Sequence, residues 1–394
     1  MARQLAANAG GYLPRVGVLS GFAGTGKSTV LQQVVQSLPG SIMLAPTGKA
    51  AVRMMDITNE RASTIHRWTY ESELDEQTGN VQFFRRELNK IKRPDSNLII
   101  VDECSMLGAK VWQDLHYVAT GLKCSILLVG DSYQLPPIVG PNETPFSVFD
   151  ENFACHAKVN LTEIMRQAEG NPIIAASMEI RTGCNSYAAL KRLPNIMPLE
   201  FDAELKRVLG DGGMVICFKN ETRHTINNHY RKIMGFGQEI QAGEPILVLK
   251  NNYLADIMNG ETFSFTGYGD KVGMRKVFDG DKSDLEVNFF TTKVNDKEVV
   301  LGEEVVAGQR QKLTPHWLEK AMWYYTRKGV PYLHCNYGYA LTAHKAQGHQ
   351  ARKVMVILEP GVYLGNEDGR RWAYTAITRG EEEVSIFYWN GFRG

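Results

Sequence analysis

The feature that most constrains this sequence is a short glycine-rich stretch near its start, Gly21-Phe-Ala-Gly-Thr-Gly-Lys-Ser28. It matches the pattern G-x-x-x-x-G-K-[ST] and lies between an apolar run, Val16–Leu19, and a segment with helical spacing that begins near Ser28. The glycines let backbone N–H groups wrap a chain of phosphates, and the N-terminus of the following helix adds favourable partial charge. We therefore expect an α/β domain in which a strand, a phosphate-binding loop and a helix follow one another.

The side chains of this loop have separate predicted roles in binding a nucleoside triphosphate and Mg²⁺. Lys27 would reach the β- and γ-phosphates, and the Ser28 hydroxyl would ligate the metal ion. The predicted nucleotide-binding residues of the loop are Gly21, Gly24, Thr25, Gly26, Lys27, Ser28 and Thr29. The alternative is a glycine-rich turn without a ligand, and the strand–loop–helix context argues against it.

Two further polar groups follow apolar runs, at the position where ligands bind in open α/β sheets. Asp102-Glu103 comes directly after Leu98–Val101, and Gln134 follows the run Ser125–Gly130. We expect Asp102 to ligate Mg²⁺ and Glu103 to polarise the attacking water as a general base. The Gln134 amide is able to donate to a γ-phosphate and to accept from that water. Read without this context, the acidic pair would be a solvated loop and the Gln134 segment a turn with two prolines.

Apolar runs bounded by turn residues predict buried strands in two groups. The first group comprises 16–19, 41–45, 98–101 and 125–130, and the second comprises 214–218, 354–358 and 384–388. Because these runs are continuous and have helical patterns between them, we expect parallel sheets that are covered on both faces. Two segments fit neither sheet and are interpreted as inserts. The predicted domains are 1–155 with a 67–97 insert, then 156–261 together with 336–394, and a small β-rich insert at 262–335.

Composition restricts the class of protein further. Of the 394 residues, 43% are apolar and 22% are charged, as in soluble globular proteins. No apolar run approaches the roughly 18 residues that cross a bilayer, and the start lacks an apolar signal core, so the cytoplasm is expected. The six cysteines have no Cys-x-x-Cys spacing, which favours free thiols over a zinc site or disulfides. The net charge of +1 neither supports nor excludes a locally basic groove.

Further short motifs, taken in order along the chain, resemble those of superfamily 1 helicases, specifically the 1B branch with RecD and phage Dda. Besides the three segments above, they are Ala45-Pro-Thr-Gly-Lys-Ala-Ala51, Ser63-Thr-Ile-His66, Leu161-Thr-Glu-Ile-Met-Arg166, Leu341-Thr-Ala-His-Lys-Ala-Gln-Gly348 and Tyr374-Thr-Ala-Ile-Thr-Arg-Gly380. Any one of them would be weak evidence, whereas the ordered set is strong. The resemblance implies a P-loop NTPase fold with two RecA-like domains, and it implies ATP and Mg²⁺ as cofactors.

The resemblance also assigns residues of the second domain to the nucleotide site. Arg166 and Arg379 would enter it as arginine fingers that stabilise charge on the transferring phosphoryl group. Hydrolysis would then be coupled to closure of the cleft between the domains. Gly348 and Glu261 match positions on the nucleotide side in relatives. The alternative for the two arginines is an ordinary surface pairing with carboxylates.

Residues of both domains resemble the family's track for single-stranded DNA. Hydroxyl, imidazole and ammonium groups suit contacts to phosphate and sugar that carry no sequence code. Outside such motifs, the two histidines would more often be structural. The predicted DNA-binding residues are Pro46, Thr47, Lys49, Thr64 and His66, followed by Thr342, His344 and Lys345.

The two inserts correspond to accessory elements of the family. The 67–97 insert lies where relatives place a β-hairpin that splits the duplex, with a turn at Thr78-Gly79-Asn80. Phe83, or else Phe84, is the predicted aromatic residue that stacks on the last base pair, and the alternative is that both anchor the hairpin. The 262–335 insert would be an SH3-like domain. Three of its aromatic side chains could equally belong to its core or face DNA, and they are Trp317, Trp323 and Tyr324.

One departure from the family concerns the start of the chain. Relatives carry an adenine-reading glutamine in a helix some distance before the loop, and here Gln4 is the sole candidate, close to Gly21. Either the entry helix is shortened or the natural beginning is missing. The choice of ATP over other triphosphates is therefore less firmly predicted than the use of a triphosphate.

The predicted function is that of an ATP-dependent DNA helicase that translocates on single-stranded DNA and unwinds duplexes, as a monomer. The resemblance implies 5′-to-3′ travel, and no residue shows the direction independently. Expected partners are single strands, duplex junctions and proteins of replication, repair or recombination, in a bacterium or a phage-infected cell, with no membrane contact. The alternatives are a translocase that displaces proteins and a RecD-like ATPase subunit that needs partner chains.

Overall fold

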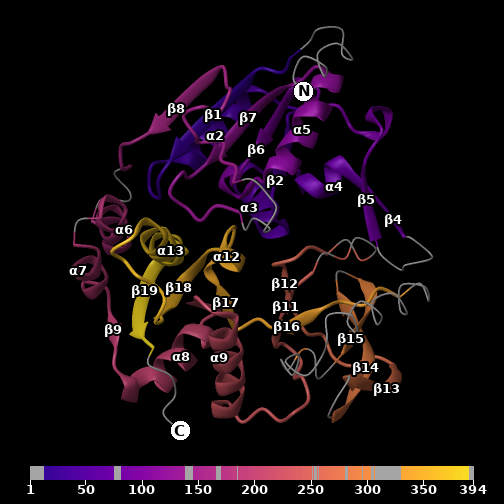
Figure 1. The fold of residues 1–394 in the computed structure, drawn as a ribbon, viewed down its shortest axis with the longest axis vertical. Helices are drawn as coiled ribbons and strands as arrows, with labels where there is room; N and C mark the ends of the chain where they lie inside the picture. The colour runs from indigo at the N-terminus through magenta and orange to yellow at the C-terminus, as the bar shows by residue number, and fades with distance from the viewer. Residues whose placement is uncertain are drawn as a thin grey trace.

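In the residues that it describes, the computed structural model has two parallel sheets and three small antiparallel sheets (Figure 1). It describes residues 13–74, 81–137, 145–165, 170–183, 185–250, 252, 255, 257–279, 283–294, 296–302, 306 and 330–389. In the described part of the chain, no helix is both long and apolar enough to cross a membrane.

The first sheet has six strands in the order β3-β2-β6-β7-β1-β8, and every neighbouring pair is parallel. Its strands are β1 (Val16–Gly21), β2 (Ile42–Ala45), β3 (Ala62–Thr64), β6 (Leu98–Val101), β7 (Ser125–Gly130) and β8 (Ala157–Leu161). Its helices are α2 (Lys27–Ser37), α3 (Gly48–Thr58), α4 (Ile65–Thr69) and α5 (Ala109–Leu122), with short 3-10 turns at Leu88–Lys90 and Cys104–Met106. The predicted parallel sheet is confirmed.

Both faces of this sheet are buried, which explains the continuous apolar runs. Ile99 and Val101 of β6 pack into one core cluster, together with residues of α5. Ile100, between them in the sequence, packs into the other cluster with Leu31 of α2 and Met54 of α3. Successive side chains of a strand point to opposite faces, so a strand with helices on both sides must be apolar at every position.

Strand β8 was not predicted, and its position changes one expected boundary. It pairs with β1 in parallel, from Gly17 opposite Ala157 to Gly21 opposite Leu161. The first sheet therefore extends past residue 155, where the sequence pattern placed the end of the first domain. Residues 157–160 are exposed, so this edge strand carries polar side chains and lacks the apolar run that identified the others.

The second sheet has five parallel strands in the order β17-β10-β18-β19-β9. They are β9 (Asn195–Ile196), β10 (Met214–Cys217), β17 (Ala340–Thr342), β18 (Ala351–Leu358) and β19 (Gly380–Tyr388). Its helices are α6 (Pro172–Thr182), α7 (Ser186–Lys191), α8 (Phe201–Gly210), α9 (Asn220–Ile233), α12 (Ala343–Ala346) and α13 (Glu367–Ile377), with a 3-10 turn at Pro198–Glu200. Residues of α8 and α9 join one core cluster of this sheet, and residues of α6, α7, α12 and α13 join the other.

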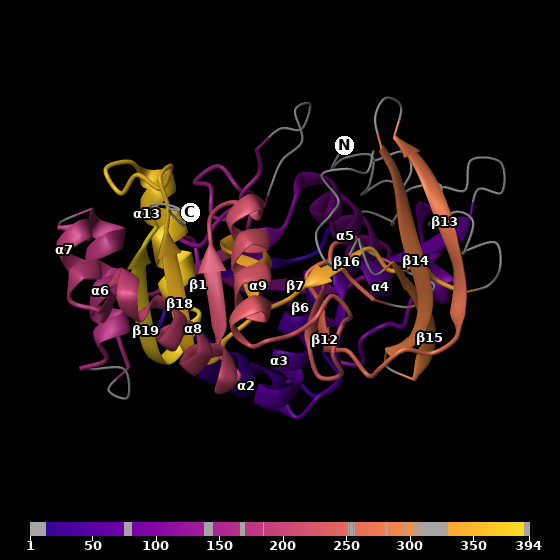
Figure 2. The ribbon, with the colours of Figure 1, turned by 90° about the horizontal axis from the view of Figure 1, so that it is seen from below.

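The small sheets lie beside the second parallel sheet (Figure 2). One consists of β11 (Pro245–Val248), β12 (Thr262–Ser264) and β16 (Cys335–Tyr337), and another of β13 (Lys271–Asp279), β14 (Ser283–Val294) and β15 (Lys297–Gly302), all antiparallel. Phe290 of β14 and Leu301 of β15 belong to the same core cluster as Val215 of β10. An SH3-like fold for this insert stays a prediction, and its three aromatic candidates at 317, 323 and 324 lie outside the described residues.

The predicted hairpin is an antiparallel pair, β4 (Tyr70–Leu74) and β5 (Val81–Arg85), that follows α4 directly. Its strands pair from Tyr70 opposite Arg85 to Leu74 opposite Val81. The expected turn at 78–80 lies outside the described residues. Phe83 and Phe84 are the third and fourth residues of β5, the second strand of the hairpin.

Candidate nucleotide site between the two parallel sheets

A cavity of about 490 Å³ lies between the first domain and the second. Its volume is in the range of natural ligand sites. The first domain contributes the phosphate-binding loop and the carboxyl ends of β6 and β7, and the second contributes the start of α6 and the turn between α13 and β19. The described lining comprises Phe22, Ala23, Gly24, Gly26, Lys27, Ser28, Thr29, Leu31, Arg53, Asp102, Glu103, Asp131, Gln134, Met165, Asn171, Ile174, Gln350, Thr378, Arg379, Gly380 and Glu381.

The phosphate-binding loop is held in shape by its own side chains. Lys27 Nζ donates to the carbonyl oxygens of Gly21 at 2.6 Å and Phe22 at 2.9 Å, and the Thr25 hydroxyl donates to Phe22 O at 2.8 Å. Gly26 has φ +82°, a left-handed conformation that favours glycine. These bonds fix the shape of the loop, and the Thr25 hydroxyl is directed inward rather than toward the cavity.

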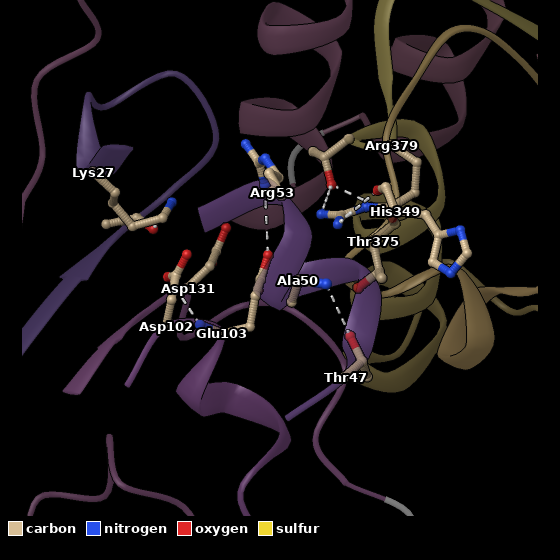
Figure 3. Close-up of polar contacts among 12 residues, drawn as sticks. Lys27, Thr47, Ala50, Arg53, Asp102, Glu103, Asp131, His349, Thr375 and Arg379 are labelled. Atoms are coloured by element: carbon tan, nitrogen blue, oxygen red, sulfur yellow. Dashed lines mark hydrogen bonds and ion pairs between the residues drawn. The ribbon is translucent and has the colours of Figure 1, made fainter. Parts of the chain in front are cut away.

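Three carboxylates lie opposite Lys27 at the ends of β6 and β7 (Figure 3). Burial, and then the neighbouring charge of Glu103, raises the pKa of Asp102 to about 6. Burial also raises the pKa of Asp131, and the nearby Lys27 charge opposes this. Glu103 is held by Arg53 of α3, with 3.7 Å between Arg53 Nη1 and Glu103 Oε1. A cluster of buried acids is costly without cations, and the charges of Arg53 and Lys27 oppose the rise in the pKa of Asp102.

Gln134 connects the acidic side of the cavity to the second domain. With its amide oriented so that both ends are satisfied, Nε2 donates to Glu103 Oε2 at 3.2 Å and Oε1 accepts from Arg379 Nη2 at 3.2 Å. Arg379 is only 2% exposed, and its Nε also donates to Thr375 O at 3.1 Å. A carboxylate, an amide and a guanidinium thus form one continuous chain across the cavity.

The segment after β7 is bound by the second domain at several further points. Leu135 donates its N–H to Thr375 Oγ1 at 3.0 Å, and its carbonyl accepts from Gln347 Nε2 at 2.7 Å. Arg371 Nη1 donates to Ser132 O at 3.0 Å. We call residues 131–135 the latch segment, because it belongs to the first domain and is held by α13 and by the residue after α12. Movement between the domains would have to shift it.

Several predicted DNA contacts have structural roles at helix starts. Thr47 Oγ1 accepts from Ala50 N at 3.2 Å and caps α3, and Thr64 Oγ1 accepts from Arg67 N at 3.2 Å and caps α4. Thr64 and Thr342 are each only 7% exposed. These two side chains offer little surface to a strand in this structure, and their contact with DNA stays a prediction.

The other candidates of the DNA track are partly exposed. Pro46, Thr47 and Lys49 are half-buried at the start of α3. Burial lowers the pKa values of His66 and His344, so both are mostly neutral at pH 7 and would serve as hydrogen-bonding groups rather than as cations. Lys345 Nζ donates to Asn259 Oδ1 at 2.8 Å.

The place of Gly348 and Glu261 on the nucleotide side stays a prediction. The described lining of the cavity includes neither residue. A Cβ on Gly348 would be 2.8 Å from Thr47 Oγ1 and 3.1 Å from Ala50 Cβ, so this glycine allows the second domain to approach the start of α3. A Cβ on Gly48 would clash with Glu261 Oε1, which places that carboxylate at the same helix start. Both residues thus lie at the contact between the second domain and α3.

Phe83 and Phe84 are partly exposed, at 38% and 44%. They face opposite sides of the hairpin because they are adjacent in a strand, with Phe83 opposite Ser72 and Phe84 opposite Glu71. At most one of them can face a given duplex end. The geometry does not choose between them.

Comparisons with known proteins agree with this arrangement. The family model described as an AAA domain matches residues 3–195, and that of the UvrD-like helicase C-terminal domain matches residues 337–387. The ATP-dependent RecD2 DNA helicase of Deinococcus radiodurans is 30% identical over 392 residues, which cover 93% of this chain and 46% of that protein. The ATP-dependent DNA helicase dda of Enterobacteria phage T4 is 23% identical over 436 residues, and 93% of each chain is covered.

The two family models and these relatives support a place for the chain among the superfamily 1B helicases, similar to RecD2 and Dda. Its fold is also that of the Bacteroides Pif1 helicase in complex with ADP-AlF3 and ssDNA, with a TM-score of 0.54 and 18% identity. That likeness covers 99% of this chain and 92% of the other. The chain spans less than half of RecD2 and nearly all of Dda.

Of the predicted site residues, the structure brings Lys27, Ser28, Asp102, Glu103 and Arg379 to one cavity, together with the Gln134 amide. The second predicted finger, Arg166, lies outside the described residues, as does Gln4. Its neighbour Met165 is described: its N–H donates to Gly24 O at 3.0 Å, and its side chain lies over Gly26.

Sequence reasoning missed three residues that the structure places at the site. Tyr374 stood inside a quoted motif and Asp131 between Gly130 and Gln134, both without a role, although a buried acid after a strand is a recognisable signal. Arg53, one turn into α3, had no signal beyond its helical position. Each is identified only by its contacts.

Proposed function

We propose that this chain is an ATP-dependent DNA helicase that moves on single-stranded DNA, in the 5′-to-3′ direction, and unwinds duplexes. One observation carries the proposal: the cavity is shared, with Lys27 and Glu103 from the first domain and Arg379 from the second. A nucleotide bound there would be touched by both domains. Binding and hydrolysis would then change the distance between two surfaces that grip a strand.

The residues of the cavity support hydrolysis of the γ-phosphate. Glu103 would accept a proton from the attacking water as that water forms a bond to the γ-phosphorus, and ADP would leave with the electrons of the broken bond. Gln134 would orient the water, because its amide already contacts Glu103. Lys27 and Arg379 would stabilise the charge on the phosphoryl oxygens. Arg166 is proposed as a second finger, on the family resemblance alone.

Mg²⁺ fits the donor set at the acidic side of the cavity. Ser28 and Asp102 both line it and offer the hydroxyl and carboxylate oxygens that this ion prefers. The raised pKa of Asp102 indicates that its negative charge is poorly compensated, and a cation would stabilise it. When bound, the ion would neutralise charge on the phosphate oxygens.

The nucleic-acid track is proposed to cross both domains beside the start of α3. Candidates are Pro46, Thr47, Lys49 and His66 on the first domain and His344 and Lys345 on the second; Thr64 and Thr342 would need a local rearrangement. We also place the end of the first domain after Leu161, because β8 completes its sheet. A cytoplasmic location, a monomeric state and partners in replication, repair or recombination remain proposals from the family.

The test is ATP turnover by the purified chain with and without single-stranded DNA. Lys27→Ala should abolish turnover, because Lys27 is the cation of the phosphate-binding loop. Lys158→Ala is a matched control: its Nζ also donates to two backbone carbonyls, Phe149 O and Asp150 O at 3.1 Å each, but it lies on the edge strand β8. Turnover that rises with DNA in the wild type and the control, but not in Lys27→Ala, supports the proposal. Turnover indifferent to DNA would reject a stand-alone helicase.

A further inference from the structure

One hydroxyl joins the phosphate-binding loop to the latch segment. Tyr374 Oη accepts from the N–H of Ala23 at 2.8 Å and donates to Asp131 Oδ2 at 2.6 Å. Ala23 belongs to the loop, Asp131 follows β7, and Tyr374 comes from α13 of the second domain. The Tyr374 and Asp131 side chains are almost completely buried, at 0% and 1% exposed. A single oxygen atom of the second domain thus bridges two separate parts of the first.

Asp131 transmits this contact to Gln134. Its other oxygen, Oδ1, accepts from the N–H of Tyr133 at 2.9 Å, and its carbonyl accepts from the N–H of Gln134 at 3.4 Å. These bonds close the turn that directs Gln134 toward Glu103 and Arg379. The Tyr133 ring also packs edge-on against the Tyr374 ring, with centroids 5.3 Å apart. The direction of the Gln134 amide therefore depends on where Tyr374 holds Asp131.

Burial raises the pKa of both groups. The pKa of Tyr374 lies well above the ordinary tyrosine value, so the hydroxyl stays a donor at neutral pH. Burial also raises the pKa of Asp131, and the charge of Lys27 and the hydrogen bond from Tyr374 oppose that rise. Without the hydroxyl, a carboxylate and a loop N–H would be buried with one partner fewer each, which is costly.

We propose that Tyr374 is a positioning residue of the ATPase, which sets the phosphate-binding loop and Gln134 in their active arrangement only when the second domain is docked. This inference rests on the proposed function for the reaction it assists. Tyr374 is absent from the described lining of the cavity and acts through Ala23 and Asp131. Tyr374 therefore makes hydrolysis depend on domain closure independently of Arg379. Arg379 lines the cavity itself, whereas Tyr374 contacts the residues that form its lining.

The decisive variant is Tyr374→Phe, which removes one oxygen atom and keeps the buried ring. We expect kcat for ATP to fall about ten-fold or more, equivalent to about 1.4 kcal/mol, with KM for ATP within about two-fold of the wild type. Asp131→Asn should lower kcat similarly, and the double variant should be no worse than the poorer single variant.

Tyr339→Phe is the matched control. Tyr339 is also a buried tyrosine of the second domain whose hydroxyl donates to a buried carboxylate, Glu244 Oε1, at 2.8 Å. It lies away from the nucleotide cavity, so its loss should affect the melting temperature as Tyr374→Phe does but leave kcat unchanged. A structural role alone would lower kcat in both variants or in neither.

The ratio of variant to wild-type turnover is measured both without DNA and with single-stranded DNA. A ten-fold lower kcat in Tyr374→Phe and not in Tyr339→Phe, at unchanged KM, supports the inference. It does so whether or not DNA stimulates the wild type, because missing stimulation would reject only the helicase proposal. Wild-type kcat in Tyr374→Phe, or equal losses in the Tyr374 and Tyr339 variants, would overturn it.

Discussion

Replacing Gln134 with leucine tests whether the chain from Glu103 to Arg379 is catalytic. Gln134 is 5% exposed, and its amide contacts both neighbours at 3.2 Å. Leucine has similar bulk and no polar atoms, so the variant removes both contacts while still filling the space. Glu103 would keep Arg53, at 3.7 Å, and Arg379 would keep its bond to Thr375 O.

The expected loss follows from the two contacts. A hydrogen bond to a charged group is worth about 1.5–3 kcal/mol, and each 1.36 kcal/mol in the barrier is about ten-fold in rate. If both bonds hold the attacking water and the finger in the transition state, kcat should fall between about 10²- and 10⁴-fold. KM for ATP should change little, because Lys27 and the loop N–H groups remain.

Steady-state ATP turnover measures this loss, with thermal melting to show that the fold is kept. Arg379→Lys is combined with Gln134→Leu in a double-mutant cycle, since a lysine cannot reproduce the planar guanidinium contacts. Residues that act as a unit give a double variant no slower than the worse single variant. A kcat within three-fold of the wild type for Gln134→Leu, or losses that add in full, would refute this reasoning.

Three other outcomes follow from the structure. Phe83→Ala should keep DNA-stimulated ATP turnover and slow duplex unwinding, and unwinding that is slowed only by Phe84→Ala would move the assignment to the other face of the hairpin. Arg231→Met should lower the free energy of unfolding, measured in urea, by about 3–5 kcal/mol, because it leaves buried Glu244 without its cation; a loss below about 1 kcal/mol would contradict this. Burial, and then the charge of Lys49, lowers the pKa of His349 to about 4, so the unfolded chain binds a proton between about pH 6.5 and pH 4 that the folded chain does not. Stability should therefore fall as the pH drops through this window, and less steeply in His349→Gln; equal slopes would exclude His349 as the cause.

The sequence predicted the strands that have apolar side chains on both faces. Ile99, Ile100 and Val101 are all 0% exposed, so an uninterrupted run was unavoidable there. Strands that are exposed or very short were missed: β8 is exposed at the sheet edge, and β3, β9 and β17 have two or three residues each. The α/β class with parallel sheets is confirmed because it depends on the buried strands alone.

The residues of the site also separate into those that a local sequence pattern predicts and those that only the fold brings together. Lys27, Asp102 and Glu103 were predicted because their roles follow from their place after a strand or within a loop. The Tyr374–Asp131 contact joins residues 243 apart in sequence, and no local pattern encodes such a pair. The assignment of Gly348 to the nucleotide stays a prediction, and its close approach to Thr47 is a further contact that its motif did not reveal.

The most direct test of the helicase proposal is ATP-driven strand separation of duplexes that carry a single-stranded tail on either the 5′ or the 3′ side. We expect the wild type to separate the 5′-tailed duplex with ATP, Lys27→Ala to separate none, and the 3′-tailed duplex to be separated little. Failure to separate either duplex, under conditions where single-stranded DNA stimulates ATP turnover, would contradict the helicase proposal and indicate a translocase instead.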